Sequence, residues 1–305
     1  MSDPILFDET FMRKLEQLSL VVRRAKTGHF KGERRSVKRG QSVEFADYRN
    51  YVRGDDLRAL DWNIYARLER PFIKLFEEEV DQTVHLLFDS SASMNWPPLE
   101  NSLLGANNDQ NKWFFARRLI AALGYIALSN HDRLFVAGLA GENFWLWGPE
   151  RRRQSVHTLL NFLSDFSIST TTNLAQSLRR YAQQAKRPGL LFIVSDFLTT
   201  DDYQSGLSAL QSQGHELAIL HLLSPDEIEP NLSGDLQLRD IETDVRRDIT
   251  VNSTLKRLYQ QHFEAWQGEL EQYCLRRQIN YALINTNQPF ESLILHYMRR
   301  RGFVR

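Results

Sequence analysis

Apolar runs of strand length alternate with amphipathic segments from about residue 83 to the end of the chain. The apolar runs predict strands over residues 84–88, 134–139, 144–147, 190–194, 217–222 and 281–284. Helical spacing of apolar residues predicts helices over 112–128, 152–162, 174–185, 203–211, 253–277 and 292–300. This alternation is typical of a doubly wound α/β domain with a mostly parallel sheet. The short link around Gly141 indicates that 144–147 is an antiparallel edge strand.

The chain before this alternation has a different pattern, which divides it into residues 1–80 and 81–305. An amphipathic helix is predicted over residues 9–25, with Asp8 as its N-cap. Its apolar positions are Phe11, Leu15, Leu18 and Val22. Residues 43–79 are dense in aromatic and charged side chains, which favours a small irregular or β-rich module over a free linker. Within the second region, residues 227–251 predict a small β-hairpin excursion.

Residues 23–39 carry a run of Lys and Arg side chains against a single acidic residue, Glu33. Glycines interrupt any regular element there, so the sequence predicts an exposed basic loop. Contact with nucleic acid is the alternative function for this loop. Phe30 is weak aromatic support for base stacking, so a solvated loop is the simpler interpretation.

The composition of the chain narrows the classes of function that we expect for it. Lys plus Arg equals Asp plus Glu at 38 each, so no global field attracts nucleic acid or an anionic membrane. The single cysteine, Cys274, excludes an internal disulfide and fits a reducing compartment. The first ten residues are acidic where a secretory signal would be basic, and no apolar run approaches the roughly 20 residues of a membrane helix. We therefore expect a cytoplasmic protein without a membrane span.

Candidate chemistry follows two of the predicted strands. Asp89, Ser91 and Ser93 come directly after the run 84–88, where alternate side chains of a tight turn can converge on one point. Asp196 follows the run 190–194 in the same way, and Thr172 precedes the helix at 174. Parallel strands end at one edge of a sheet, so these oxygens would face one crevice if the two strands are neighbours. Hard oxygen donors of this kind suit one Mg²⁺ or Mn²⁺ ion.

These five residues resemble the metal-ion-dependent adhesion site (MIDAS) of von Willebrand factor type A domains, in order and in spacing. A second resemblance is carried by residues 44–51, Glu-Phe-Ala-Asp-Tyr-Arg-Asn-Tyr, followed by Gly54-Asp55-Asp56-Leu57-Arg58 and Asp61-Trp62. Those motifs are similar to the bacterial "domain of unknown function 58" family, whose members carry them just before an A-type domain. The resemblance implies a von Willebrand factor A-like fold over residues 81–305.

The resemblance also implies roles. Ser91, Ser93 and Thr172 would offer hydroxyl oxygens, while Asp89 and Asp196 would act directly or through water. One coordination position would stay open for an Asp or Glu of a protein partner. The family's usual association implies a MoxR-type AAA+ ATPase as that partner, in chaperone-like or complex-maturation activity. On this interpretation the protein is a metal-dependent adaptor and not an enzyme.

Several alternatives stay open. The main rival is a metal-dependent phosphohydrolase that uses the same site. An aspartyl phosphotransferase would want a second carboxylate two residues after Asp89, where the chain has Ser91. A serine-hydrolase elbow and a phosphate-binding loop are both absent from the sequence. Either Thr172 or Asn173 could simply cap the following helix.

Overall fold

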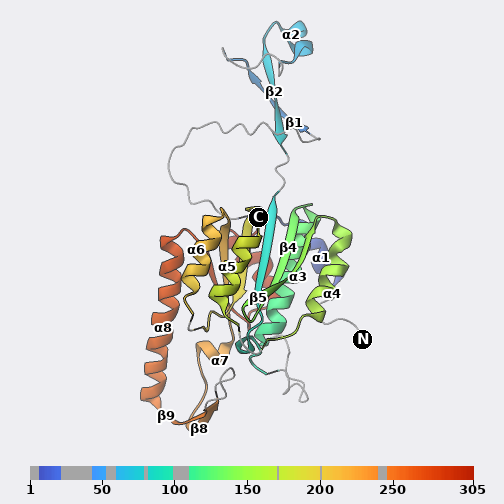
Figure 1. Ribbon diagram of the computed structural model, residues 1–305. Coiled ribbons are helices and arrows are strands. Elements are labelled where there is room, and N and C mark those ends of the chain that lie inside the picture. Colours follow the sequence, from blue (N-terminus) through green and yellow to red (C-terminus); the bar gives the residue numbers. More distant parts are fainter. Residues whose placement is uncertain are drawn as a thin grey trace. The chain divides into compact units, whose positions relative to one another are not determined.

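The computed structural model describes residues 7–21, 43–52, 60–78, 82–98, 110–169, 172–199, 201–239 and 246–305. The chain forms two compact units (Figure 1). The larger unit combines Met1–Lys26 with Gln82–Arg305, and the smaller one is Thr27–Asp81. The basic run 23–39 and the Gly54–Arg58 motif lie outside the described residues, so the nucleic-acid alternative stays a prediction.

A six-stranded sheet forms the centre of the larger unit. Its strands are β3 (Thr83–Asp89), β4 (Arg133–Ala140), β5 (Asn143–Glu150), β6 (Leu190–Ser195), β7 (Glu216–Leu223) and β10 (Asn280–Asn285). Their order across the sheet is β10-β7-β6-β3-β4-β5, and every neighbouring pair is parallel except β4 and β5. This confirms the predicted mostly parallel sheet with one antiparallel edge strand. All residues of β6 are buried, as a strand covered on both faces requires.

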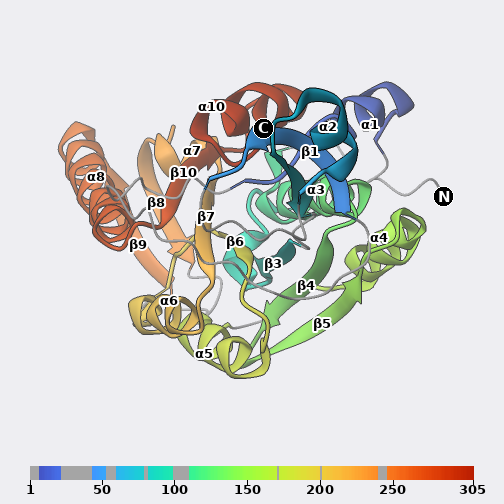
Figure 2. The ribbon, with the colours of Figure 1, turned by 90° about the horizontal axis from the view of Figure 1, so that it is seen from above.

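Helices cover both faces of this sheet (Figure 2). Leu86 and Phe88 of β3 point into a core shared with α1 (Glu9–Leu15), α3 (Lys112–Ser129) and α4 (Val156–Asp165). Leu87, between them, points into the opposite core, which is shared with α5 (Leu174–Gln184), α6 (Tyr203–Ser212) and α8 (Ser253–Arg276). The alternation of side chains along one strand thus builds two hydrophobic layers.

Close packing of β4 on Phe166 requires a glycine. A Cβ atom added to Gly138 would lie 2.3 Å from Cζ of Phe166, well inside van der Waals contact. We expect Gly138→Ala to lower the free energy of unfolding by about 1–3 kcal/mol, because the aromatic ring must shift within a packed core. Urea denaturation measures this change. Gly268→Ala is the matched control, since nothing lies within 4 Å of its added Cβ atom in helix α8; it should be neutral or stabilising.

The N-terminal helix is shorter than the sequence predicts. Asp8 caps it as expected, with Oδ1 accepting the N–H of Phe11 at 2.6 Å. The helix ends at Leu15, and the chain then runs beside the C-terminus, where Leu20 bridges to Val304. This backbone pairing competes with helix continuation. The sequence groups the helix with residues 1–80, whereas in the structure Leu15 lies in the core of the larger unit.

The smaller unit contains an antiparallel pair, β1 (Val43–Asn50) and β2 (Phe72–Glu78), and a short helix α2 (Trp62–Leu68). Asp61 begins this helix, because its Oδ1 accepts the N–H groups of Asn63 and Ile64. The predicted β-rich character of residues 43–79 is thus borne out over the described part. The Asp61 carboxylate thus serves as the N-cap of this helix.

The predicted hairpin excursion is also present. Helix α7 (Pro225–Ile228) leads into the antiparallel strands β8 (Gly234–Arg239) and β9 (Arg246–Val251). The C-terminal helix predicted over 292–300 is split into α9 (Phe290–Ser292), a π-helical turn (Leu293–Met298) and α10 (Arg299–Arg301). In the described part of the chain, every helix is too short or too polar to cross a membrane.

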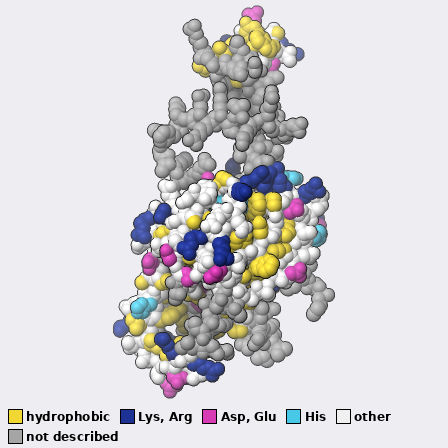
Figure 3. Space-filling view, in the orientation of Figure 1, with side chains coloured by type: hydrophobic (Ala, Val, Ile, Leu, Met, Phe, Trp, Pro, Cys, Tyr) yellow, Lys and Arg dark blue, Asp and Glu magenta, His cyan; other side chains and the backbone are white. Residues whose placement is uncertain are grey.

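The edge strand β5 exposes two large apolar side chains, one on each face of the sheet. Trp145 is 65% exposed and Leu146 is 46% exposed. Figure 3 shows hydrophobic side chains gathered over the region of β4 and β5.

Candidate functional site

The candidate site lies at the edge of the sheet where β3 and β6 end. These strands are adjacent and parallel, with Phe88 opposite Val194, so Asp89 and Ser195 follow at the same level. The chain goes from β3 to β4 on one side and later enters β6 on the other side. Such a reversal of strand order is where α/β sheets bind ligands. The expected meeting of the two strand ends is therefore confirmed.

The turn after β3 brings its hydroxyl groups together. Asp89 Oδ1 accepts the N–H of Ser91 at 2.9 Å, and a 3-10 turn (Ala92–Met94) follows. Ser91 Oγ and Ser93 Oγ are 2.9 Å apart. Ser90 holds this turn in place, because its N–H donates to the carbonyl of Leu139 at the end of β4. The alternating spacing predicted from the sequence thus converges, as expected.

Asp89 is a buried carboxylate with hydrogen bonds but without a cation. Its Oδ2 accepts the hydroxyl of Ser195 at 2.8 Å, and its residue exposure is 4%. It forms no ion pair within the described part of the chain. Burial, followed by repulsion from Asp196, raises the pKa of Asp89 from 3.8 to about 6. A cation beside the Asp89 carboxylate would offset both effects and favour its ionised form.

Thr172 lies in a third loop at this edge. It bridges to Gly141 at the end of β4, and the same loop reaches the turn after β3 through the Ser169 N–H, which donates to the Ser90 carbonyl at 2.7 Å. Asn173, and not Thr172, caps helix α5 through the N–H of Gln176. Thr172 Oγ1 is buried and has no hydrogen-bond partner among the described residues. A buried hydroxyl without such a partner is free to bind an atom that the fold itself does not provide.

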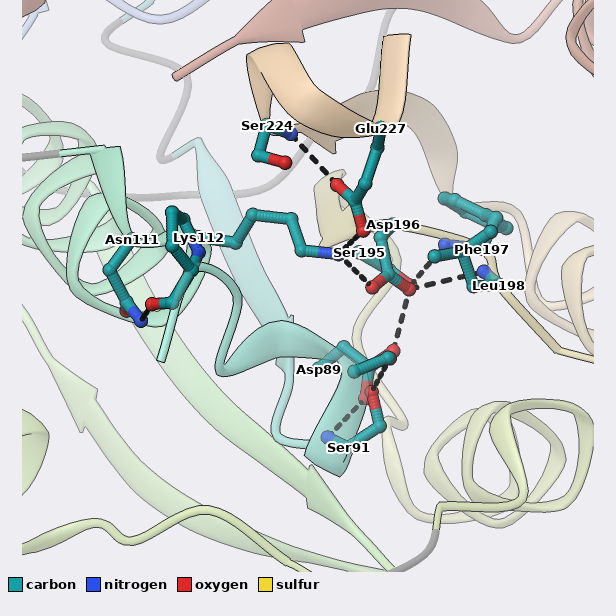
Figure 4. A network of polar contacts seen from close by, with 12 residues as sticks. Asp89, Ser91, Asn111, Lys112, Ser195, Asp196, Phe197, Leu198, Ser224 and Glu227 are labelled. Carbon is teal, nitrogen blue, oxygen red and sulfur yellow. Dashed lines mark hydrogen bonds and ion pairs between the residues drawn. The ribbon is translucent and has the colours of Figure 1, made fainter. Parts of the chain in front are cut away.

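Asp196 faces an ammonium group that the sequence did not anticipate (Figure 4). Lys112 Nζ, from the first turn of α3, is 2.6 Å from Asp196 Oδ2 and 2.5 Å from Glu227 Oε1. The side chains of Lys112 and Asp196 are 0% and 1% exposed. Asp196 Oδ1 accepts the N–H of Leu198 at 3.1 Å. The second carboxylate of the candidate site is thus already paired within the protein.

Two further residues, Ser224 and His221, hold this ion pair in place. Glu227 Oε2 accepts the N–H of Ser224, which fixes the carboxylate at the start of α7. His221 Nε2 lies 2.9 Å from the backbone carbonyl of Asp196, and its Nδ1 lies 2.8 Å from the Tyr281 hydroxyl. Because a carbonyl only accepts, Nε2 carries the proton and Nδ1 accepts from the tyrosine. Burial lowers the pKa of His221 to about 4, so the ring is neutral at pH 7.

Sequence reasoning missed Lys112, Glu227, Ser195 and His221 as parts of the site. One local signal was present for Lys112. Acidic residues are favoured in the first turn of a helix and basic ones are disfavoured there, because of the helix dipole. A lysine as the first residue of a mostly buried helix therefore indicates a carboxylate partner elsewhere. Glu227 was assigned to the hairpin excursion, where nothing in the local pattern distinguishes it.

The candidate oxygen donors are of the kind that a divalent ion prefers. Adjacent oxygen ligands in an octahedron of 2.0–2.1 Å bonds lie about 3 Å apart, and the hydroxyls of Ser91 and Ser93 have this separation at 2.9 Å. The buried Thr172 hydroxyl and the buried Asp89 carboxylate are also oxygen donors of the kind that a hard cation takes. Clusters of three or more His, Cys, Asp or Glu are absent from the described part of the chain.

His85 is a core residue, 1% exposed, with Nδ1 at 2.8 Å from the Tyr181 hydroxyl and Nε2 at 3.0 Å from the Arg187 carbonyl. Cys274 is buried in helix α8, and burial raises the pKa of its thiol to about 12, so it is inert. Both residues therefore belong to the packing of the fold.

Comparison with known proteins identifies relatives. Residues 47–268 match the family described as "Protein of unknown function DUF58". "Uncharacterized protein Rv1480" of Mycobacterium tuberculosis and "Uncharacterized protein Mb1516" of Mycobacterium bovis are each 24% identical over 252 residues, which is 82% of this chain and 76% of the relative. Among solved structures, the conserved hypothetical protein BatB from Bacteroides thetaiotaomicron aligns at a TM-score of 0.41 and 13% identity, over 72% of this chain and 98% of that one. The family match covers most of the chain and includes the N-terminal motifs from residue 47 onward, so the chain belongs to the bacterial family of unknown function DUF58.

Proposed function

We propose that this protein is a metal-dependent interaction module of the von Willebrand factor A type. Asp89, Ser91, Ser93, Thr172 and Asp196 would hold one Mg²⁺ or Mn²⁺ ion, directly or through water. The observation that carries the proposal is the buried Asp89 carboxylate, which forms no ion pair among the described residues and lies at the same sheet edge as the paired hydroxyls of Ser91 and Ser93. A divalent ion held there would supply electrophilic character, and an acidic side chain of a partner would take its last coordination position in place of water.

The surroundings of the site support protein contact. Asp89 is in register with Leu139, and Leu139 with Phe144, so the exposed Trp145 lies near the level of the site. The distance across two strand spacings is about 10 Å. A partner that offers a carboxylate to the metal could therefore also cover Trp145 of β5. Burial of this side chain would add affinity that a single metal contact lacks.

We propose a MoxR-type AAA+ ATPase as the partner, with chaperone-like or complex-maturation activity as the role of the pair. This part of the proposal rests on the resemblance of the N-terminal motifs and of the site residues to the family pattern. Residues Glu44–Tyr51 and Asp61-Trp62 carry the first resemblance, and the five site residues carry the second. The adaptor would then present its metal site to an acidic side chain of the ATPase or of its client.

A pull-down tests this proposal. The tagged protein should retain a MoxR-type ATPase of the same organism in Mg²⁺, and lose it in EDTA, because the shared ligand sphere disappears with the ion. Asp89→Ala should lose it in Mg²⁺ as well. Asp165→Ala, at an exposed position in helix α4, is the control and should retain it. Equal recovery in every lane would contradict the proposal. Turnover of phosphoesters by the pure protein, lost in Asp89→Asn, would favour the phosphohydrolase instead.

A further inference from the structure

A fully buried lysine lies beside the proposed metal ligands. The Lys112 side chain is 0% exposed, and its ammonium is shared between Asp196 Oδ2 and Glu227 Oε1 at 2.6 and 2.5 Å (Figure 4). Lysine is almost never fully buried unless it is paired. The two contacts use two of the three N–H donors of the ammonium. Lys112 is thus a cation built into the site by the fold.

The charge state of Lys112 follows from its neighbours. Burial alone would lower its pKa, but the carboxylates of Asp196 and Glu227 raise the pKa above its ordinary value. The side chain is therefore an ammonium at pH 7. Its position is also constrained at the backbone, because the Lys112 N–H donates to the Trp96 carbonyl at 2.9 Å and Asn111 caps the helix through the N–H of Phe114.

The two holders of Lys112 differ in their relation to the proposed metal. Asp196 is also one of the proposed metal ligands, so a divalent ion and the ammonium would draw on one carboxylate. Glu227 is on α7, its side chain is 18% exposed, and it is not among the proposed ligands. When a divalent ion draws on Asp196, repulsion between the cations favours the contact of Lys112 with Glu227.

We propose that Lys112 sets the metal affinity of the site: it competes with the divalent ion for Asp196, and Glu227 keeps the ammonium when the ion binds. This inference rests on the proposed function, and it adds an affinity-setting residue to that function. The site would therefore bind a divalent ion only when the free ion concentration is high enough to compete with the Lys112 ammonium, or when a partner's carboxylate adds a further ligand. Loading would thereby be coupled to capture of the partner.

Titration calorimetry with Mg²⁺ tests this inference. Lys112→Met should bind Mg²⁺ about tenfold more tightly than the wild type or better, because a neighbouring charge at contact distance shifts ionic equilibria by about 1–3 logarithmic units. Its Mg²⁺-induced rise in melting temperature should also exceed that of the wild type, since the ion replaces the lost cation. Lys186→Met is the control, at an exposed position before β6 at the opposite end of that strand. It should bind as the wild type does.

The outcomes separate the two proposals. If the wild type binds and Lys112→Met binds equally or more weakly, the inference on Lys112 is overturned while the proposed function stands. If only Lys112→Met binds, the inference is supported and a metal-loaded native site is ruled out. If neither binds, both are overturned. Should Lys112→Met not fold, Lys112→Met with Glu227→Gln removes one charge of each sign, frees Asp196, and should show the same tighter binding.

Discussion

Asp89→Asn is expected to weaken Mg²⁺ binding by about 100-fold or more, because it removes a charged ligand. Mutation of residues that only support the ligands of a metal site already lowers metal affinity by about 10–100-fold. The same change should leave the metal-free protein at least as stable as the wild type at pH 7. The reason is that burial and Asp196 raise the pKa of Asp89 to about 6, so its ionised form is disfavoured in the folded state. Asparagine is neutral and keeps an oxygen for the N–H of Ser91.

The pH dependence follows from the sign of this shift. A carboxyl whose folded pKa is raised from 3.8 to about 6 binds more protons in the folded state than in the unfolded state between those values. Its contribution to stability is therefore lost as pH rises through this window. In EDTA, the advantage of Asp89→Asn over the wild type should grow from pH 4 to pH 7. The stabilisation of the wild type by Mg²⁺ should grow in the same direction, because the ion binds the deprotonated carboxylate.

Thermal unfolding of the wild type and of Asp89→Asn at several pH values, with Mg²⁺ and with EDTA, checks both the loss of Mg²⁺ binding and the pH dependence of stability. Asp165→Asn, at an exposed position, is the matched control and should follow the wild type. A variant at position 89 that binds Mg²⁺ as the wild type does would contradict the assignment of Asp89 as a ligand. A variant that is much less stable than the wild type in EDTA would contradict the statement that the ionised Asp89 carboxylate destabilises the folded state.

Asp196→Asn should have the opposite effect on stability. It removes one of the two partners of the buried Lys112 ammonium, which then retains Glu227 alone. Breaking a buried ion pair from one side costs about 3–5 kcal/mol, because a charge is left without compensation. The free energy of unfolding from urea denaturation measures this loss. The two carboxylates of one candidate site thus differ: Asp196 supports the fold, and Asp89 does not.

A double-mutant cycle isolates the ion pair. Asp196→Asn combined with Lys112→Met leaves no unpaired ammonium, so the double variant should recover part of the stability that Asp196→Asn loses. Additive losses would show that the two side chains do not stabilise one another. Asp196→Asn as stable as the wild type would contradict the role of Asp196 as the counter-ion of Lys112.

The fold was largely predictable because its signals are local. The strands β3 and β6 are apolar runs ending in Asp89 and Ser195-Asp196, and the rule that parallel strands end together was sufficient to place both aspartates at one edge. The edge strand β5 followed from the short link at Gly141. In each case the deciding residues lie within a few positions of one another in the chain.

The parts that could not be predicted depend on distant partners. Lys112 meets Asp196 and Glu227 across 84 and 115 residues, and its own helix pattern only marks it as the first residue of α3. The N-terminal helix ends at Leu15 because the following residues pair with the C-terminus near Val304, which no local pattern shows. In both cases contacts with distant parts of the chain decide the structure, and the local spacing of apolar residues does not.

Diffraction at the manganese edge from crystals grown with Mn²⁺ is the most direct test of the central claim that oxygens from three loops bind one divalent ion. The account predicts a single anomalous peak at this sheet edge, within about 2.5 Å of the hydroxyl oxygens of Ser91 and Ser93, with the Thr172 hydroxyl and the carboxylates of Asp89 and Asp196 around it. Absence of a peak there at millimolar Mn²⁺, with Lys112 still between Asp196 and Glu227, would contradict it.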